Sequence, residues 1–341
     1  MPRRSRRLNP PCHLDGLSDD LVMRMFSRAP FMTHGTLHGV CRRLKTLLRS
    51  CEFLQQRVDS GLVEHGIVVA GGRQDGDVSA DCSMSTSGRW RAIAPMSGPR
   101  YNACSAIVED EDGQPEMWVM GGYDARNRLA TVEAYNLRTN AWRSCLPLSQ
   151  RRSGAVAGVV GGRLVVAGGV ARDVGYLTSV EAYTPTGWIR LPPLPHIATA
   201  ATACVLNGRL YVMSGGACDK LQVLETSEEH GFSWTVKADL SHRSYGAASA
   251  VYEGKAWFIG DRALGVYAPA NDTWAAGPPL PRLHKLVHNN FEPAITATTI
   301  LDGELCVVTS YGILTLRNGK WVAVSTRRST AFPTCASLLL G

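Results

Sequence analysis

The feature that most constrains this 341-residue chain is a repeat, in which an apolar run ends at glycine and a tryptophan follows. The run at residues 117–122 and its tryptophan at 142 are the clearest copy. Six copies of the run are present, at residues 67–72, 117–122, 164–169, 210–216 and, in decayed form, 256–260 and 305–310. The tryptophans that follow them are Trp90, Trp142, Trp188, Trp234, Trp274 and Trp321. The regular spacing of these tryptophans predicts an array of structural repeats.

Each copy of the repeat has the composition of a small antiparallel sheet. Polar and apolar residues alternate in Val132–Tyr135 and in Val180–Tyr183, with the two-residue period of a half-buried strand. After the tryptophan come a proline-rich turn and a strand of small residues, such as Ala103–Val108. Four short strands and no convincing helix correspond to one propeller blade. We therefore predict a mainly all-β protein with a six-bladed β-propeller.

The repeating residues also suggest a family. Glycine permits a positive φ and a close approach of backbone, and a large indole can fill the space between twisted neighbouring sheets. With Gly121-Gly122, Tyr135 and Trp142 in this order, the repeat resembles the kelch repeat. The resemblance covers residues 67–341 and implies a kelch β-propeller.

The first copy of the repeat lacks the small-residue strand that precedes every other copy. An apolar stretch at residues 334–340 follows the last tryptophan, where a seventh copy would begin. We therefore predict that residues 334–340 pair beside residues 67–72 and close the ring, which removes exposed sheet edges.

The segment before the repeats has apolar residues at helical spacing. Ser18 is positioned to cap a helix whose first turn carries Asp19 and Asp20, where acidic groups suit the helix dipole. A second helix is predicted from the spacing of Val40, Cys41, Leu44, Leu47 and Leu48. Such short helices bury little apolar surface alone, so the segment needs a partner or a neighbour.

The sequences LDGLSDDLVMRMFSRAP and VCRRLKTLLRSCEF resemble an F-box, a family that docks on the Skp-type adaptor of a cullin-RING ubiquitin ligase. The residues that match the family pattern are Leu17, Asp19, Asp20, Leu21, Val40, Cys41 and Arg42. Ser18 stands where the family usually has proline, and Leu44 where tryptophan is frequent. The resemblance implies an adaptor-binding face of Leu14, Leu17, Leu21, Val22, Met25, Phe26, Val40, Cys41, Leu44 and Leu48. The alternative is a helical cap on the propeller.

We predict four segments along the chain. They are a disordered basic arm (1–12), an F-box helical domain (13–53), a linker helix (54–66) and the propeller (67–341). Four arginines between residues 3 and 7 supply much of the net charge of +7. A solvated arm is favoured over a nuclear import signal or nucleic-acid binding.

Cysteine usage indicates the compartment. The ten cysteines are scattered singly, and Cys104, Cys204 and Cys306 lie inside apolar strands, which predicts buried free thiols in a reducing environment. A metal site of Cys12, Cys41 and Cys51 with a nearby histidine is the less favoured alternative. No membrane-length apolar run or signal-peptide core is present, so we expect a cytoplasmic and/or nuclear protein without a membrane partner.

Catalytic motifs are not recognisable in the sequence. Kelch-like rings include a copper oxidase and sugar-acid isomerases, but the nine histidines here are dispersed. The glycine pairs are turn and blade glycines rather than phosphate-binding loops. We predict a non-enzyme without a cofactor, and keep a propeller enzyme and a non-ubiquitin scaffold as alternatives.

The loops after the glycine runs and after the tryptophans emerge on one face of an up-and-down propeller. They carry more basic than acidic residues, with tyrosines among them, and arginine and tyrosine often anchor interfaces. The predicted substrate-binding residues are Arg100, Tyr101, Tyr123, Arg152, Arg243, Tyr245 and Arg282. An arginine that opens an inner strand is also part of the kelch pattern, and some of these are expected only to bond loop carbonyls. The predicted function is the substrate-recognition subunit of an SCF-type (Skp-cullin-F-box) ubiquitin ligase, with an acidic or phosphorylated protein as substrate.

Overall fold

A computed structural model describes most of the chain, in two compact units. Outside the described residues are 1–13, 15, 30–40, 49, 51, 54–55, 58–59, 61–63, 75–76, 87–88, 112, 216–219, 238–247, 261–263, 282–294, 302, 310–311, 327–333 and 341. One unit consists of Met1–Glu64 with Leu339–Gly341, and the other of His65–Leu338. The second unit begins two residues before the predicted start of the propeller.

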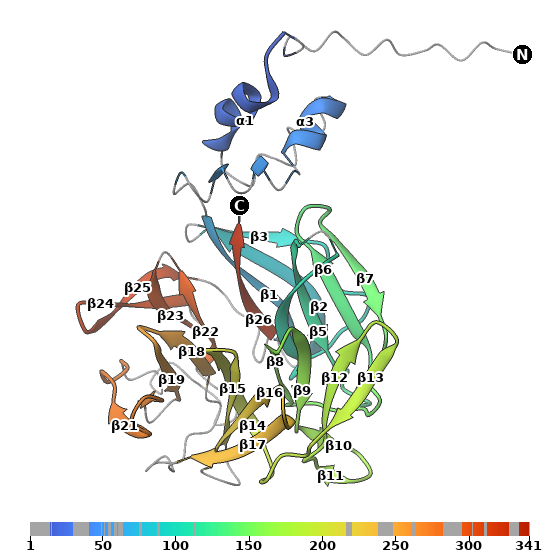
Figure 1. Ribbon diagram of the computed structural model, residues 1–341, viewed down its shortest axis with the longest axis vertical. Coiled ribbons are helices and arrows are strands. Elements are labelled where there is room, and N and C mark those ends of the chain that lie inside the picture. The colour runs from blue at the N-terminus through green and yellow to red at the C-terminus, as the bar shows by residue number, and fades with distance from the viewer. Residues whose placement is uncertain are drawn as a thin grey trace, which may run out of the picture. The chain divides into compact units, whose positions relative to one another are not determined.

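Six four-stranded sheets form a β-propeller in the second unit, which confirms the predicted fold (Figure 1). Blade 1 has the strand order β26-β1-β2-β3 and consists of β1 (Glu64–Gln74), β2 (Asp77–Thr86), β3 (Arg89–Ile93) and β26 (Thr334–Leu340). Blade 2 consists of β4 (Cys104–Glu109), β5 (Pro115–Met120), β6 (Val132–Asn136) and β7 (Ala141–Cys145). Blade 3 consists of β8 (Val156–Val160), β9 (Arg163–Ala167), β12 (Val180–Thr184) and β13 (Gly187–Leu191). A separate hairpin of β10 (Val170–Ala171) and β11 (Gly175–Tyr176) follows β9.

The remaining three blades each use four strands that are consecutive in sequence. Blade 4 consists of β14 (Thr199–Leu206), β15 (Arg209–Gly215), β16 (Leu221–Ser227) and β17 (Gly231–Lys237). Blade 5 consists of β18 (Ala248–Tyr252), β19 (Lys255–Ile259), β20 (Leu264–Ala268) and β21 (Thr273–Ala276). Blade 6 consists of β22 (Ile295–Leu301), β23 (Glu304–Thr309), β24 (Gly312–Arg317) and β25 (Lys320–Thr326).

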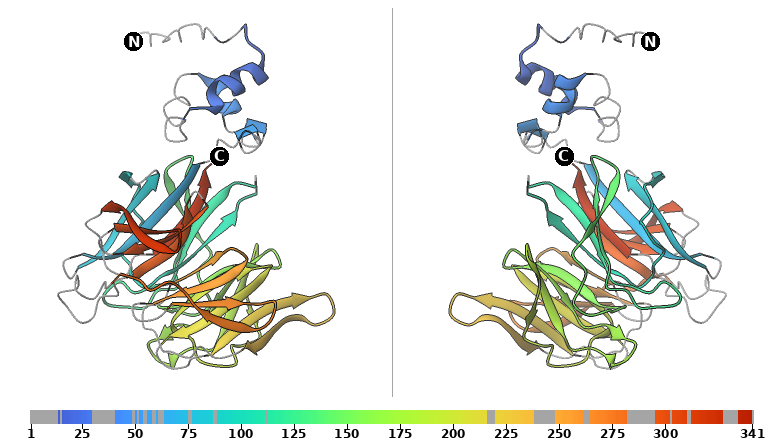
Figure 2. Two further views of the ribbon diagram at one scale, coloured as in Figure 1. Left: turned by 90° about the vertical axis from the view of Figure 1, so that its left-hand side faces the viewer. Right: turned by 90° about the vertical axis from the view of Figure 1, so that its right-hand side faces the viewer.

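Strand β26 closes the ring as the sequence predicts. It is hydrogen-bonded to β1 in blade 1, and Figure 2 shows the red strand beside the blue one. A buried apolar cluster joins Ile67 and Val69 of blade 1 to Cys306 and Val308 of blade 6. Burial of each such side chain contributes about 1.5–3 kcal/mol. Blades at the two ends of the repeat array are therefore held together by both backbone and core.

The glycine runs are required by contacts between neighbouring blades. Gly121 has a φ of 63°, and a Cβ atom there would lie 2.5 Å from the carbonyl oxygen of Arg152 in the next blade's entry segment. Gly122 N–H donates to this same oxygen at 2.9 Å. Only glycine allows both the left-handed backbone and this close approach without strain.

The tryptophans also connect blades, as their repetition predicts. Trp142 Nε1 donates to the carbonyl of Ala94 at 2.8 Å, just beyond the outer strand of the preceding blade. Trp188 bonds the carbonyl of Leu146 at 2.9 Å in the same way, one blade further on. Each indole thus fills interblade space and satisfies its N–H group there.

The described residues of the other unit include the short helices α1 (Asp19–Ser27) and α3 (Arg42–Leu47). The predicted cap is confirmed, because Ser18 Oγ accepts from Leu21 N at 3.3 Å. Arg43 ties the two helices together, with Nε donating to Asp19 Oδ1 at 2.9 Å. A small core of Val22, Leu44 and Leu47 lies between them.

Burial makes three cysteines of the propeller unreactive. It raises the pKa of Cys82 to about 11 and the pKa of Cys104 and Cys204 to about 12. At about pH 8 roughly one in a thousand of these thiols, or fewer, is the reactive thiolate. We expect iodoacetamide to spare these three cysteines in the native protein and to modify them after unfolding, as measured by peptide mass spectrometry. The half-buried Cys41 is the control that should react faster, and equal labelling of all four would contradict the prediction.

Candidate functional site

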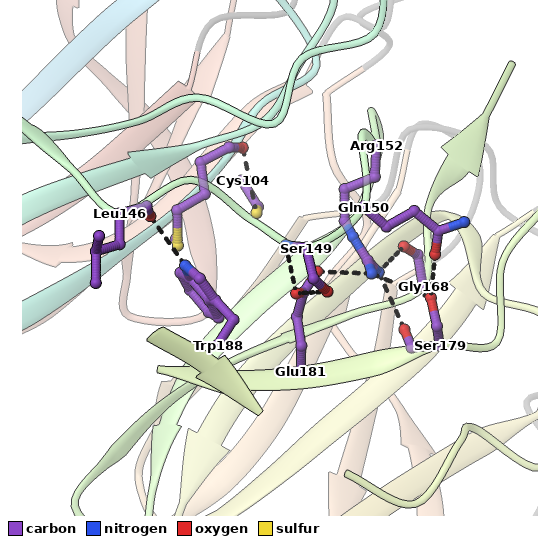
Figure 3. A network of polar contacts seen from close by, with 10 residues as sticks. Cys104, Leu146, Ser149, Gln150, Arg152, Gly168, Ser179, Glu181 and Trp188 are labelled. Atoms are coloured by element: carbon purple, nitrogen blue, oxygen red, sulfur yellow. Dashed lines mark hydrogen bonds and ion pairs between the residues drawn. The ribbon is translucent and has the colours of Figure 1, made fainter. Parts of the chain in front are cut away.

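Arg152 lies at the centre of a buried polar network in blade 3 (Figure 3). Its Nη1 donates to the carbonyls of Gly168 and Ser179 at 2.8 and 3.0 Å, and its Nη2 contacts Glu181 Oε1 at 2.8 Å. The second oxygen of Glu181 accepts from Ser149 N at 2.9 Å. Burial lowers the pKa of Arg152, and the charge of Glu181 opposes that shift. The network fixes the segment that enters the blade.

Blade 2 contains the same arrangement around Arg100. This guanidinium contacts the carboxylate of Glu133 and donates to the carbonyls of Gly121 and Thr131 at 3.2 Å. The side chains of Arg100 and Arg152 are only 2% and 1% exposed. The prediction that Arg100 and Arg152 bind substrate is therefore wrong, because neither side chain reaches solvent. Both arginines instead bond loop carbonyls, as the sequence analysis expected for some arginines that open an inner strand.

Blade 4 carries a neutral version of this network. Gln222 occupies the position of the glutamate. The strand register shows this equivalence, because Leu221 and Gln222 pair with β15 in the same way as Val132 and Glu133 pair with β5. Ala198 occupies the position of the arginine. Its carbonyl accepts from Gly169 N at 3.1 Å, as the carbonyl of Arg152 accepts from Gly122 N in the preceding blade. Gln222 is fully buried and exchanges two hydrogen bonds with the backbone of His196, at 2.8 and 3.2 Å. The charged pair and the neutral pair are alternative solutions within one chain.

Four other side chains form a group at the loop ends of blades 1 and 2, which we call the tyrosine–arginine cluster: Arg73, Tyr101, Tyr123 and Arg128. Arg73 is exposed and the other three are half-buried. The rings of Tyr101 and Tyr123 meet edge to face, with centroids 5.5 Å apart. The Arg73 guanidinium lies 5.4 Å from the Tyr101 ring and that of Arg128 lies 5.9 Å from the Tyr123 ring. Each cation–π contact contributes about 0.5–1 kcal/mol at such sites. Of the predicted substrate residues, Tyr101 and Tyr123 are brought together here.

The loop that carries half of this cluster is held by its own polar contacts. Asp124 Oδ1 accepts from the backbone N–H groups of Arg126 and Asn127 at 2.8 and 2.6 Å. These bonds lower the pKa of the Asp124 carboxyl. Tyr123 and Tyr101 exchange backbone hydrogen bonds at 2.9 and 3.0 Å. The cluster therefore sits on a fixed backbone.

The β10–β11 hairpin of blade 3 exposes two apolar side chains. Val174 is 69% exposed and Tyr176 is 58% exposed, while Leu177 is buried and anchors the base. Ser153 and Val170 exchange hydrogen bonds at 3.1 and 2.8 Å, and Gly154 N donates to Asn102 O at 2.8 Å. The hairpin is thus joined through backbone contacts to Tyr101.

The sequence analysis did not predict the buried glutamate partners of the arginines or the β10–β11 hairpin, for identifiable reasons. Glu133 and Glu181 interrupt apolar strands at matching positions, which was the available signal for buried partners of the arginines. No signal marked the hairpin, because the short segment from Val170 to Tyr176 has no strand periodicity. The remaining predicted substrate residues, Arg243, Tyr245 and Arg282, lie outside the described residues.

The predicted adaptor residues divide by exposure. Val22, Leu44 and Leu48 are buried and belong to the interior of the helical unit, so their assignment to a contact surface is corrected. The residues that pack half-buried around this interior are Leu14, Leu17, Phe26 and Cys41. Leu21 and Met25 are 45% and 54% exposed, one helical turn apart on α1. Val40 lies outside the described residues.

The helices among the described residues include none with the length and apolar character needed to cross a membrane. The histidine, cysteine and acidic side chains of the described residues form no group of three or more that could hold a metal ion.

The kelch motif model matches residues 113–148 and 151–195. These ranges fall in blades 2 and 3, the blades with the buried Arg100–Glu133 and Arg152–Glu181 pairs. Residues 113–148 and 151–195 are therefore similar to kelch repeats, and both ranges lie within the six-bladed β-propeller.

Curated relatives support this description over parts of the chain. Kelch repeat-containing protein kel-10 of Caenorhabditis elegans is 31% identical over 111 residues, which are 32% of this chain and 19% of the relative. An F-box/kelch-repeat protein of Arabidopsis thaliana is 26% identical over 180 residues, 50% of this chain and 46% of the relative. The chain thus spans less than half the length of each. The solved structure of YjhT shares the fold, with a TM-score of 0.56 at 14% identity over 78% of this chain and 96% of that one.

Proposed function

We propose that the protein is a substrate receptor of a cullin-RING ubiquitin ligase, without catalytic activity of its own. In this role the N-terminal helices bind a Skp-type adaptor and the propeller binds the protein to be modified. The observation that carries the proposal is the pair of exposed apolar side chains, Leu21 and Met25, on α1 of a separate helical unit. Relatives named F-box/kelch-repeat proteins support it. The role places the protein in the cytoplasm or nucleus.

Leu21 and Met25 are available to a partner because they do not form the interior of the helical unit. The interior of the helical unit is supplied by Val22, Leu44 and Leu47 instead. Asp20 and Arg24 beside the pair form an exposed ion pair at 3.0 Å. An apolar patch with a polar rim is the usual arrangement of a protein interface.

Replacing Leu21 and Met25 by aspartate is expected to weaken capture of a purified Skp-type adaptor by about 30-fold or more, since truncated interface anchors cost about 1–2 kcal/mol each. The affinity is measured by titration with full-length protein. Both side chains face solvent, so the melting temperature should be unchanged.

Val174→Asp is the matched control, because it places the same charge on an exposed apolar site of the propeller. It should leave adaptor capture intact. Wild-type protein that fails to bind the adaptor would leave the scaffold alternative standing, and equal binding by wild type and double variant would reject the proposed surface.

A further inference from the structure

The outer strand of blade 4, β17, forms a long and regular sheet edge. It lies on the rim of the propeller, and among the described strands it pairs with β16 alone (Figure 1). This pairing runs without a register shift from Ser227 opposite Gly231 to Leu221 opposite Lys237. An edge strand presents unpaired backbone N–H and C=O groups, so it can pair with a strand from another chain.

The other outer strands carry features that protect a sheet edge, and β17 lacks them. Strands β3, β7 and β13 each contain an arginine inside the strand, β21 has only 4 residues, and the pairing of β24 with β25 contains a register shift. In β17 the charged residue is Lys237, at the end of the strand. Internal charges, bulges and short length are the usual protections against edge pairing. Among the described outer strands, β17 is therefore the best suited to a partner strand.

The sequence of β17 is complementary to itself when two copies pair antiparallel about Trp234. Phe232 of one copy then lies opposite Val236 of the other, and the two Trp234 residues lie opposite each other. These three residues share one face of the sheet, because side chains alternate along a strand. Val236 is 43% exposed, while Phe232 and Trp234 are half-buried. Aromatic and β-branched cross-strand pairs of this kind stabilise antiparallel sheets.

The charges at the two ends of β17 are complementary in the same register. Lys237 ends the strand, and the exposed Glu228 and Glu229 lie in the turn before it begins. Pairing about Trp234 places Lys237 of one copy opposite Gly231 of the other, so Glu229 of that copy is within diagonal reach. The two ends of β17 lie about 20 Å apart within one chain. Attraction between Lys237 and Glu229 therefore arises between copies.

We infer that the protein forms a twofold-symmetric dimer in which the β17 strands of two copies pair antiparallel and join their two blades into one continuous sheet. The partner of the edge is a second copy because the twofold axis repeats both the apolar pairs and the ion pairs, as a contact between identical surfaces requires. A peptide of unrelated sequence would match neither set. The inference goes beyond the proposed function and does not rest on it.

Sedimentation velocity of the full-length protein measures this association. The wild type should dimerise reversibly over about 1–100 µM, since a contact of this length is smaller than a standard interface. Val236→Asp should weaken the dimer roughly tenfold or more, because it places a carboxylate opposite Phe232 of the second copy. The melting temperature of this variant should stay unchanged, because Val236 faces solvent in the single copy. Ile189→Asp is the matched control, since Ile189 is 39% exposed on β13, the outer strand of blade 3.

An exchange of charges tests the register independently of Val236. Lys237→Glu alone and Glu229→Lys alone should each weaken the dimer roughly three- to tenfold. The double variant should restore it, because opposite charges again face each other between copies. A wild type that stays monomeric over the whole concentration range would overturn the inference. Equal dimerisation of Val236→Asp and Ile189→Asp, or a double variant no better than the single ones, would overturn it as well.

Discussion

Removal of residues 334–341, and with them β26, is expected to lower the melting temperature of the propeller by about 10 °C or more. The seven-residue strand β26 supplies several ladder hydrogen bonds to β1, each worth about 0.5–1.5 kcal/mol net. A loss of about 3–6 kcal/mol is a large part of the roughly 5–15 kcal/mol that stabilises a typical protein. The edge of β1 would also become available for intermolecular pairing.

Thermal unfolding followed by circular dichroism measures this effect. Removal of Gly341 alone is the control, because it leaves β26 complete and should not change the melting temperature. A synthetic peptide of residues 334–341 added to the truncated protein should restore part of the lost stability. A truncated protein that melts within about 2 °C of the intact one would show that blade 1 does not depend on β26.

Replacing Arg152 by alanine is expected to cost about 3–5 kcal/mol, because it leaves the carboxylate of Glu181 buried without its partner. That carboxylate is 2% exposed and, among the described residues, would keep the hydrogen bonds from Ser149. The double variant Arg152→Ala with Glu181→Gln should recover most of the loss. It reproduces the neutral pair that blade 4 already uses, Ala198 and Gln222.

Urea denaturation gives the free energies of unfolding for this comparison. Arg151→Ala is the matched control, since Arg151 is the exposed neighbour and its loss should change stability by about 0.5 kcal/mol or less. If Arg152→Ala were no more destabilising than Arg151→Ala, the network around Arg152 would not contribute to the free energy of unfolding. Charge reversal at Arg100 or Arg152 is for the same reason unsuitable as a test of substrate binding, because it would unfold the blade.

The repeat made the architecture predictable, because its glycines and tryptophans have roles that depend on local geometry. Strand β26 could be located from the strand missing before residue 67, and its predicted limits coincide with those of the structure. Exposure was harder to predict. Arg100 and Tyr101 are adjacent in sequence, yet Arg100 is buried against Glu133 and Tyr101 is half-buried in the tyrosine–arginine cluster.

Helix α1 shows the same limit. The apolar residues of this nine-residue helix lie on more than one of its sides. Their spacing therefore does not determine which side is internal. The structure buries Val22 and exposes Leu21 and Met25. This choice depends on Leu44 and Leu47 of α3, which are distant from α1 in sequence and contact it only in the folded unit.

Closure by β26 also sets the order of events during synthesis. Strand β1 leaves the ribosome about 260 residues before β26 does, which at roughly 5–20 residues per second corresponds to about 13–52 s. Throughout that interval blade 1 has an unpaired edge, while blades 2 to 5 can form from consecutive strands. A message that ends before residue 334 therefore produces a chain in which β1 lacks the strand that pairs with it.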